Sequence, residues 1–186
     1  NDKMQNPLRQ LSPRLAVSYE LAPNWRASAS TGIYYQLPPY NLMTFEENGI
    51  LANQNSLDYI RSSQGVLGIE HVAKKSYLMR IEGFYKHYSK YPFLLNENIS
   101  LDNANANYVL VGNQPATSNS TGESFGIELK INRKLRNTWF WRLSYSYIVS
   151  QFENNEGDLV ASAWDNRHAG NIVIGKTLRK NWQVGL

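Results

Sequence analysis

Apolar and polar residues alternate with a period of two along most of the chain. Successive side chains of a β-strand point to opposite faces, so this pattern predicts strands with one apolar and one polar face. The alternating segments come in pairs that are separated by short polar triplets, as in hairpins. The paired segments are 14–21 with 25–36, 67–73 with 77–86, 124–132 with 139–149, and 171–178 with 182–186. The sequence therefore predicts about eight antiparallel strands in an up-and-down order.

The four predicted turns share one arrangement: an apolar residue, three mostly polar or basic residues, and an aromatic residue. The flanking pairs are Leu21/Trp25, Ala73/Tyr77, Leu135/Trp139 and Leu178/Trp182. Amphipathic rings are most stable at the boundary between lipid headgroups and hydrocarbon, and a soluble sheet has no reason to repeat a ring at this position. We therefore expect Trp25, Tyr77, Trp139 and Trp182 to lie at a membrane interface.

The connections at the other ends of the strands are much longer and differ in charge. They cover residues 37–60, 91–122 and 152–164, and they contain eight of the 15 acidic residues but no lysine or arginine. Outer-membrane barrels combine short periplasmic turns with long extracellular loops. The chain is therefore predicted to be an all-β segment of a transmembrane β-barrel in the cell outer membrane. A soluble all-β domain would explain the alternation alone, but not its combination with aromatic turns and unequal connections.

Charged residues on the polar face set the expected register. If each polar triplet is a three-residue hairpin loop, counting outward from the turns gives specific cross-strand pairs. These pairs are Glu20/Arg26, Glu70/Arg80 and Asn132/Arg142. The residues expected to line the lumen of the barrel are Arg14, Glu20, Arg26, Glu70, Arg80, Glu82, Lys86, Glu128, Lys130 and Arg142.

The amino-acid composition further limits the classes of protein to which the chain can belong. The chain is 42% hydrophobic and 12% aromatic, yet its mean hydropathy is −0.48, which fits strands with one polar face. No apolar run approaches the roughly 18 residues of a spanning helix. Cysteine is absent, so no disulfide or thiolate metal site is available. The net charge is +4, but the basic residues are scattered rather than gathered in a stripe, so nucleic acid is not an expected partner.

One short motif formally matches an enzyme site. Residues 122–126 read G-E-S-F-G, like the nucleophile elbow of α/β-hydrolases. The elbow requires a following helix, whereas residues 127–131 alternate as a strand does. The histidines at 71, 87 and 168 fall in separate segments without helical spacing, which argues against a metal site. We therefore predict no catalytic, cofactor-binding or metal-binding residue, and no enzyme.

A dense polar cluster, W-D-N-R-H at 164–168, lies where the last long connection re-enters a strand. We expect Asp165 and Arg167 to fix the base of this loop. A contact between these residues and a ligand is the alternative.

Several segments resemble the barrel of TonB-dependent outer-membrane receptors, especially the group common in Bacteroidetes. They are SPRLAVSYEL at 12–21, TGIYYQLP at 31–38, GVLGIEH at 65–71, RIEGFYKHYSKYP at 80–92, GIELKINRKL at 126–135, LSYSYIVS at 143–150 and WDNRH at 164–168. No single segment is highly specific, but their order and spacing extend over nearly the whole chain.

The resemblance implies a barrel of about 22 strands that is closed by a separate plug domain. Such a receptor takes up a siderophore, cobalamin, haem, glycan or peptide when the inner-membrane TonB complex acts on the plug. Residues 1–186 contain no counterpart of the plug or of the TonB-interacting segment, so we expect a single incomplete barrel segment. The expected partners of the full-length protein are its plug domain, the TonB complex, outer-membrane lipid and the nutrient. A passive porin or an adhesin-type barrel is the alternative function.

Overall fold

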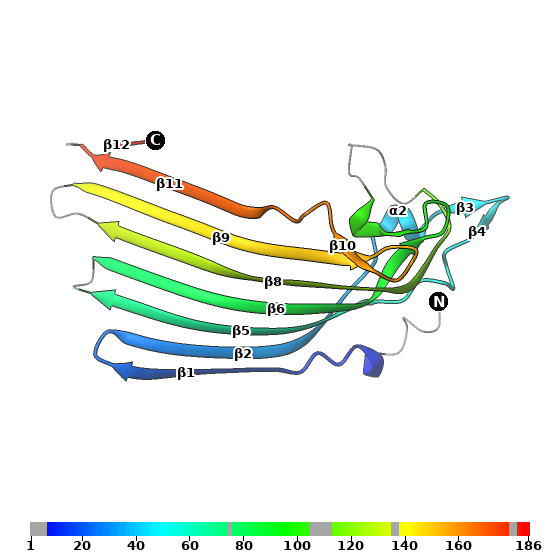
Figure 1. Cartoon of the computed structure of the whole chain (residues 1–186), viewed down its shortest axis with the longest axis horizontal. Helices are drawn as coiled ribbons and strands as arrows, with labels where there is room; N and C mark the ends of the chain where they lie inside the picture. Colours follow the sequence, from blue (N-terminus) through cyan, green and yellow to red (C-terminus); the bar gives the residue numbers. More distant parts are fainter. Residues whose placement is uncertain (1–6, 74–75, 105–112, 135–137, 179–181) are drawn as a thin grey trace.

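The computed structural model describes residues 7–73, 76–104, 113–134, 138–178 and 182–186. Eight strands follow one another in chain order across one antiparallel sheet (Figure 1). They are β1 (Arg14–Ala22), β2 (Trp25–Gln36), β5 (Ile60–Ala73), β6 (Tyr77–Leu94), β8 (Ala116–Lys134), β9 (Trp139–Glu153), β11 (Arg167–Thr177) and β12 (Gln183–Gly185). The predicted up-and-down arrangement of about eight antiparallel strands is therefore confirmed.

Short elements occupy the long connections at one end of this sheet (Figure 1). They are α2 (Tyr40–Met43), β3 (Glu46–Glu47), β4 (Ile50–Leu51), β7 (Ile99–Ser100), η2 (Leu101–Asn103) and β10 (Leu159–Ala161). A further short helix, η1 (Pro7–Gln10), precedes β1. In the part of the chain that the structure describes, no helix has the length and apolar character needed to cross a membrane.

The predicted cross-strand pairs are present in the ladders. Residues 20 and 26, 70 and 80, and 132 and 142 are paired as expected, and Ala73 pairs with Tyr77. At the last turn, the amide of Leu178 donates to the carbonyl of Trp182 at 2.7 Å, in line with the expected pair. Parts of the other predicted turns lie outside the described residues, namely 74–75, 135–137 and 179–181. The predicted pair of Leu135 with Trp139 is therefore among the pairs that the structure does not describe.

The first turn differs from its prediction. Ala22, and not Leu21, pairs with Trp25, and the register shifts between Glu20 and Ala22. A two-residue turn requires a positive φ, which asparagine tolerates, and Asn24 has a φ of 71°. The residue left over by this tighter turn is absorbed as a bulge, so the charge pairing beyond it is unchanged.

The predicted connection 91–122 is wrong at both ends. β6 continues to Leu94 and β8 begins at Ala116, because these strands stay paired beyond an irregularity in their ladder. The register shifts between Tyr88 and Tyr91, and Lys90 adopts a φ of 56°. A bulge of this kind breaks the period of two. The regular alternation from which the strand was predicted therefore stops before the strand itself ends.

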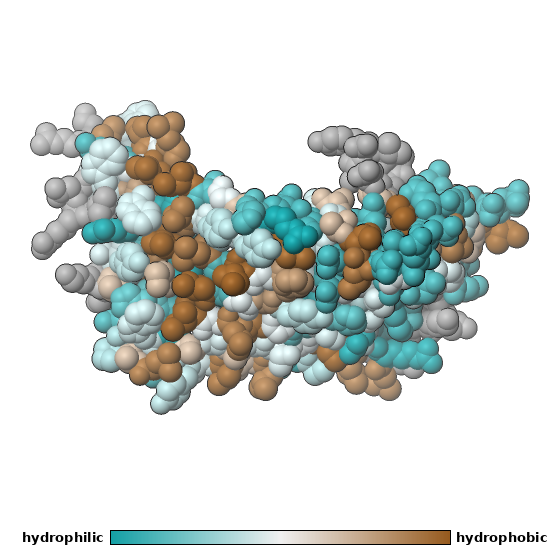
Figure 2. All heavy atoms as spheres, viewed as in Figure 1, coloured by the Kyte–Doolittle hydropathy of each residue, from teal (hydrophilic) through white to brown (hydrophobic). Residues whose placement is uncertain are grey.

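The two faces of the sheet differ in chemistry. Between the first turn and the bulge near Tyr91, the ladders from β1 to β9 pair even-numbered residues with even-numbered residues, which places all ten predicted lumen residues on one face, the polar face. The opposite, apolar face exposes large side chains such as Leu15 (69%), Leu67 (69%) and Ile127 (57%). In Figure 2 hydrophobic residues gather over the strands, and hydrophilic residues cover the end with the long connections. A continuous exposed apolar face is what a strand segment surrounded by lipid requires.

Candidate ligand-facing site

The long connections fold into a compact unit at one end of the sheet. We call residues 37–59, 95–104 and 113–115 the loop cap. Its core, with the adjoining ends of β6 and β8, consists of Leu42, Leu57, Leu94, Ala104 and Ala116, all at most 5% exposed. The cap therefore has a small hydrophobic core of its own, which holds the first two connections together.

A buried asparagine joins the two connections of the cap. The amide nitrogen of Asn53 donates to the carbonyls of Leu42 at 2.8 Å and Gln114 at 2.9 Å. Its oxygen accepts from the backbone amide of Ala116 at 2.8 Å. Asn53 is 1% exposed, so these bonds replace water for groups that are closed off from solvent.

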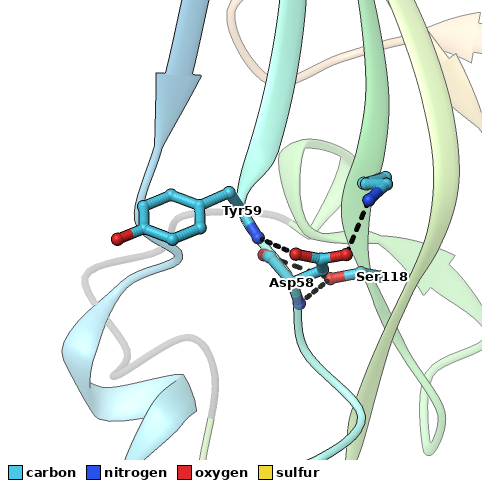
Figure 3. Close-up of polar contacts among 4 residues, drawn as sticks. Asp58, Tyr59 and Ser118 are labelled. Atoms are coloured by element: carbon cyan, nitrogen blue, oxygen red, sulfur yellow. Dashed lines mark hydrogen bonds and ion pairs between the residues drawn. The ribbon is translucent and has the colours of Figure 1, made fainter. Parts of the chain in front are cut away.

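Asp58 ties the cap to the sheet (Figure 3). Its carboxylate accepts from Lys90 Nζ at 2.6 Å and from the amide of Tyr59 at 2.8 Å. The amide of Asp58 donates to Ser118 Oγ at 2.9 Å. Because Lys90 belongs to β6 and Ser118 to β8, the end of the first connection is held against two strands.

The bulge in β6 turns a second tyrosine toward the polar face. Tyr88 and Tyr91 both lie beside the ring of Phe152, with centroid distances of 5.3 and 4.5 Å. The Tyr91 hydroxyl donates to Asp102 Oδ1 at 2.7 Å. Burial raises the pKa of the Asp102 carboxyl, and this hydrogen bond opposes the rise. The aromatic cluster thus anchors η2 of the cap over the sheet.

A row of hydroxyl groups crosses the polar face next to this cluster. Ser124 Oγ and Ser162 Oγ both donate to Ser150 Oγ, at 2.9 and 3.0 Å. Ser162 Oγ in turn accepts from the amide of Trp164 at 3.3 Å. These contacts fix the backbone of Trp164, whose side chain stays 63% exposed.

The aromatic cluster and the serine row border a cleft of about 1050 Å³ on the polar face. Its walls combine aromatic, amide, hydroxyl and charged groups, including Tyr34, Gln64, Lys86, Tyr91, Asp102 and Trp164. Such a surface can stack flat or apolar ligand groups and hydrogen-bond to polar ones. It is therefore the candidate ligand-facing site.

Four charged residues form a square on β6 and β8, and two of them, Glu82 and Glu128, line the cleft. Arg80 pairs with Lys130 and Glu82 pairs with Glu128, so like charges face each other across the ladder. Arg80 makes its ion pair with Glu82, two residues along its own strand, at 2.7 Å. Alternating the sign along each strand offsets the repulsion between strands. We predicted charge pairs only within hairpins, so this arrangement across a non-hairpin ladder was missed.

The charge pairs predicted within hairpins are weaker than their register suggests. Glu20 and Arg26 approach to 3.7 Å, and both side chains are more than half exposed. Arg80 lies opposite Glu70 but is held by Glu82. Exposed pairs of this kind contribute under about 1 kcal/mol, so register depends chiefly on which side chains each face accepts.

The aromatic residues predicted at the turns lie at the turn end of the sheet. Trp25, Tyr77 and Trp139 each begin a strand, and Trp182 immediately precedes β12. The ring of Trp25 lies 4.3 Å from that of His71, and Lys176 Nζ lies 5.0 Å from the centre of the Trp139 ring. Their position at a membrane interface stays a prediction.

Asp165 and Arg167 are brought together where β11 begins. Arg167 Nε lies 3.0 Å from Asp165 Oδ1, and the Asp165 side chain is 3% exposed. Arg167 has a φ of 46° and pairs with Ile148. This geometry supports the expected role at the base of the loop, and a ligand contact stays a prediction.

The remaining candidates do not form a reactive site among the described residues. The segment 122–126 lies within strand β8, with no helix after it. The three histidines belong to β5, β6 and β11, and His168 Nδ1 shares a 2.7 Å hydrogen bond with the Tyr145 hydroxyl. No group of three or more metal-ligating side chains is found in the described ranges.

Sequence reasoning identified only part of the cleft. Glu82, Lys86 and Glu128, which line it, were predicted as lumen residues, whereas Tyr91 and Asp102 lie in segments that were assigned to connections. The one local signal was the break in alternation over residues 88–91, where two tyrosines flank a serine and a lysine. A break of this kind in a strand is typical of a bulge, and bulges are frequent beside functional sites.

A family model described as "TonB dependent receptor-like, beta-barrel" matches residues 2–186. Similar solved structures include the ferric-catecholate import receptor Fiu from E. coli (14% identity, TM-score 0.64, covering 92% of this chain and 23% of that chain). The FrpB iron transporter from Neisseria meningitidis has 12% identity and a TM-score of 0.61, with 94% of this chain and 25% of that chain covered. The ferric yersiniabactin uptake receptor FyuA from Yersinia pestis has 15% identity and a TM-score of 0.62, with 92% and 24% covered.

At these identities the structural likeness shows the fold alone. The chain spans about a quarter of the length of these proteins, at 23–25%. No curated protein sequence matches the chain.

Proposed function

Because the chain belongs to the TonB-dependent receptor β-barrel family, whose members are outer-membrane transport receptors, we propose that it forms part of the wall of a nutrient importer. In this proposal the intact receptor contains a plug domain and draws energy from the TonB complex. The order of the segments at 12–21, 80–92 and 164–168 supports assignment to the group common in Bacteroidetes.

One observation carries this proposal beyond family membership. The sheet has an exposed apolar face for lipid, and its polar face carries a cleft directly beneath a folded cap. A wall of this kind needs its polar face toward an aqueous lumen. The ten charged residues of the polar face would then line the lumen and contact the plug.

The cleft is the part of the wall that we assign to the nutrient. Its aromatic rings and its amide and hydroxyl groups suit a ligand with both flat or apolar and polar parts. The loop connections add acidic groups without any lysine or arginine, which favours a neutral ligand, a cationic ligand or a metal complex.

Uptake by cells that produce the intact receptor tests this proposal. The probes are ferric siderophores, copper, cobalamin, haem, oligosaccharides and peptides, beginning with the iron chelates and copper named for similar structures. An importer takes up one class of probe saturably, and uptake stops in cells that lack TonB. Uptake of many small solutes in proportion to concentration, with no need for TonB, would instead identify a porin.

Two substitutions connect such uptake to the cleft. Tyr91→Ala and Trp164→Ala should each raise the concentration needed for half-maximal uptake, because each removes a ring from the cleft wall. Tyr19→Ala is the matched control, since Tyr19 is 70% exposed on the apolar face. Equal effects of all three substitutions would exclude the cleft as the ligand-facing site.

A further inference from the structure

The apolar face has a groove where two neighbouring strands lack side chains. Gly65 of β5 pairs with Tyr85, and Gly83 of β6 pairs with Leu67, so the two glycines are diagonal neighbours. A Cβ at Gly65 would meet nothing within 4 Å, and one at Gly83 would meet only the Gly126 carbonyl oxygen at 3.9 Å. The groove over these glycines has a volume of about 810 Å³.

The walls of the groove are apolar and aromatic. They include Leu15, Leu67, Tyr85, Phe125 and Ile127, each at least 37% exposed. Glycine weakens a strand, and within a sheet it often marks the close approach of another molecule. Neither of the two glycines has a positive φ, so backbone conformation does not require glycine at either position.

A polar row crosses the same face one step nearer the loop cap. It pairs Ser63 with His87, His87 with Glu123, and Glu123 with Gln151. The Tyr85 hydroxyl donates to Glu123 Oε2 at 2.9 Å, so this residue connects the groove with the row. Arg61 lies on this face one step further, and no ion pair of its guanidinium is found among the described residues.

The groove and the polar row lie at heights along the strands that correspond to the membrane leaflet on the side of the loop cap. Tyr85 lies eight residues beyond the turn-end aromatic Tyr77, which is about 27 Å along the strand and about 20 Å in height at the usual tilt. The apolar band of outer-membrane barrels is about 25 Å tall, so the polar row falls at its outer boundary. The groove thus lies at acyl-chain depth on the loop side, and Arg61 and His87 lie at headgroup depth.

We propose that this groove binds one lipid of the outer leaflet, with an acyl chain over Gly65 and Gly83 and its phosphate group beside Arg61 and His87. The surrounding hydrocarbon supplies such chains at this depth, and a groove between rigid rings holds a chain in one place where a smooth face would not. The guanidinium group of Arg61 provides the charge and the paired donors that a phosphate group requires.

Native mass spectrometry of the intact receptor in detergent tests the acyl-chain half of the proposal. The probe is a dipalmitoyl phosphatidic acid. We expect the wild-type receptor to bind it at least about ten times more tightly than the Gly65→Leu/Gly83→Leu variant, because leucine fills the groove. Gly170→Leu is the matched control, since Gly170 also lies on the apolar face of a strand with nothing within 4 Å of its Cβ position. This control should bind like the wild type.

A second pair of measurements tests the phosphate half. Arg61→Gln should weaken phosphatidic acid toward the affinity of a dipalmitoyl diacylglycerol, and it should leave the diacylglycerol unchanged. Heat-modified electrophoretic mobility verifies that every variant is a folded barrel. Equal binding by the wild type and the groove-filled variant, equal loss in the Gly170→Leu control, or a wild type that does not prefer the phosphate-bearing probe would each overturn the proposal.

Discussion

Replacing Asn53 by alanine should release the loop cap without unfolding the sheet. The substitution removes an acceptor from the amide of Ala116 and a donor from two buried carbonyls. An unpaired buried amide costs about 1 to 3 kcal/mol, and a carbonyl that loses one partner costs less. We expect the free energy of local opening of the cap to fall by about 3 kcal/mol, which is roughly a hundredfold in the opening equilibrium.

Hydrogen exchange followed by mass spectrometry of the intact receptor measures this change. Peptides that cover residues 40–57 and 113–118 should exchange roughly a hundred times faster in the variant, and peptides from the middle of β6 and β8 should not change. The cap responds alone because its contacts with the strands are few compared with the ladders themselves. Asn55→Ala provides the matched control, since Asn55 lies in the same turn but is exposed.

Three results would refute this reasoning. Unchanged exchange in the Asn53→Ala variant would show that the hydrophobic core of the cap holds the connections together without the buried amide. Equal acceleration in the Asn55→Ala control would show that the turn is sensitive to any loss of asparagine. A general acceleration along the strands would mean that the cap and the sheet unfold as one unit.

Three further predictions concern the faces, the cap and the bulge. Ile127→Lys on the apolar face should destabilise the barrel by about 2 to 4 kcal/mol, while Glu128→Lys on the polar face should not. Thermal unfolding in detergent measures this difference, and equal shifts of the melting temperature in the two variants would contradict it. Since burial raises the pKa of the Asp102 carboxyl in the folded state, ionisation costs stability above the folded pKa, and this cost disappears as pH falls toward the ordinary value of 3.8. Asp102→Asn keeps an acceptor oxygen for the Tyr91 hydroxyl but removes the charge. It should therefore slow hydrogen exchange of the cap at neutral pH and leave it unchanged at acidic pH. Faster exchange of the variant at neutral pH would show that the charge itself is needed. Lys90→Gly should relieve about 1 kcal/mol of left-handed strain and lose about as much from the ion pair with Asp58, leaving the melting temperature nearly unchanged, whereas Lys90→Ala should lower it.

The sequence alone determined the architecture because the rules of a strand are local. Alternation assigned each side chain to a face, and short polar triplets with an aromatic neighbour located the turns. Pairs such as Glu70 with Arg80 followed by counting, since a hairpin with a known turn has only one register. The exception at Leu21 shows the limit of this counting, because loop length depends on whether Asn24 adopts a positive φ.

The tertiary structure decided everything that depends on breaks in this regular pattern or on residues distant in sequence. Two strands stay paired beyond the bulge at Lys90, and this bulge turns Tyr91 toward the polar face. No local rule predicts that the Tyr91 ring lies against Phe152 or that its hydroxyl donates to Asp102. The buried contacts of Asn53 likewise join segments that are about sixty residues apart, at separations of 61 and 63. Period-two alternation reports which face a side chain occupies, whereas a cleft or a groove depends on which neighbours the ladders bring beside it, and that information exists only once the strands are paired.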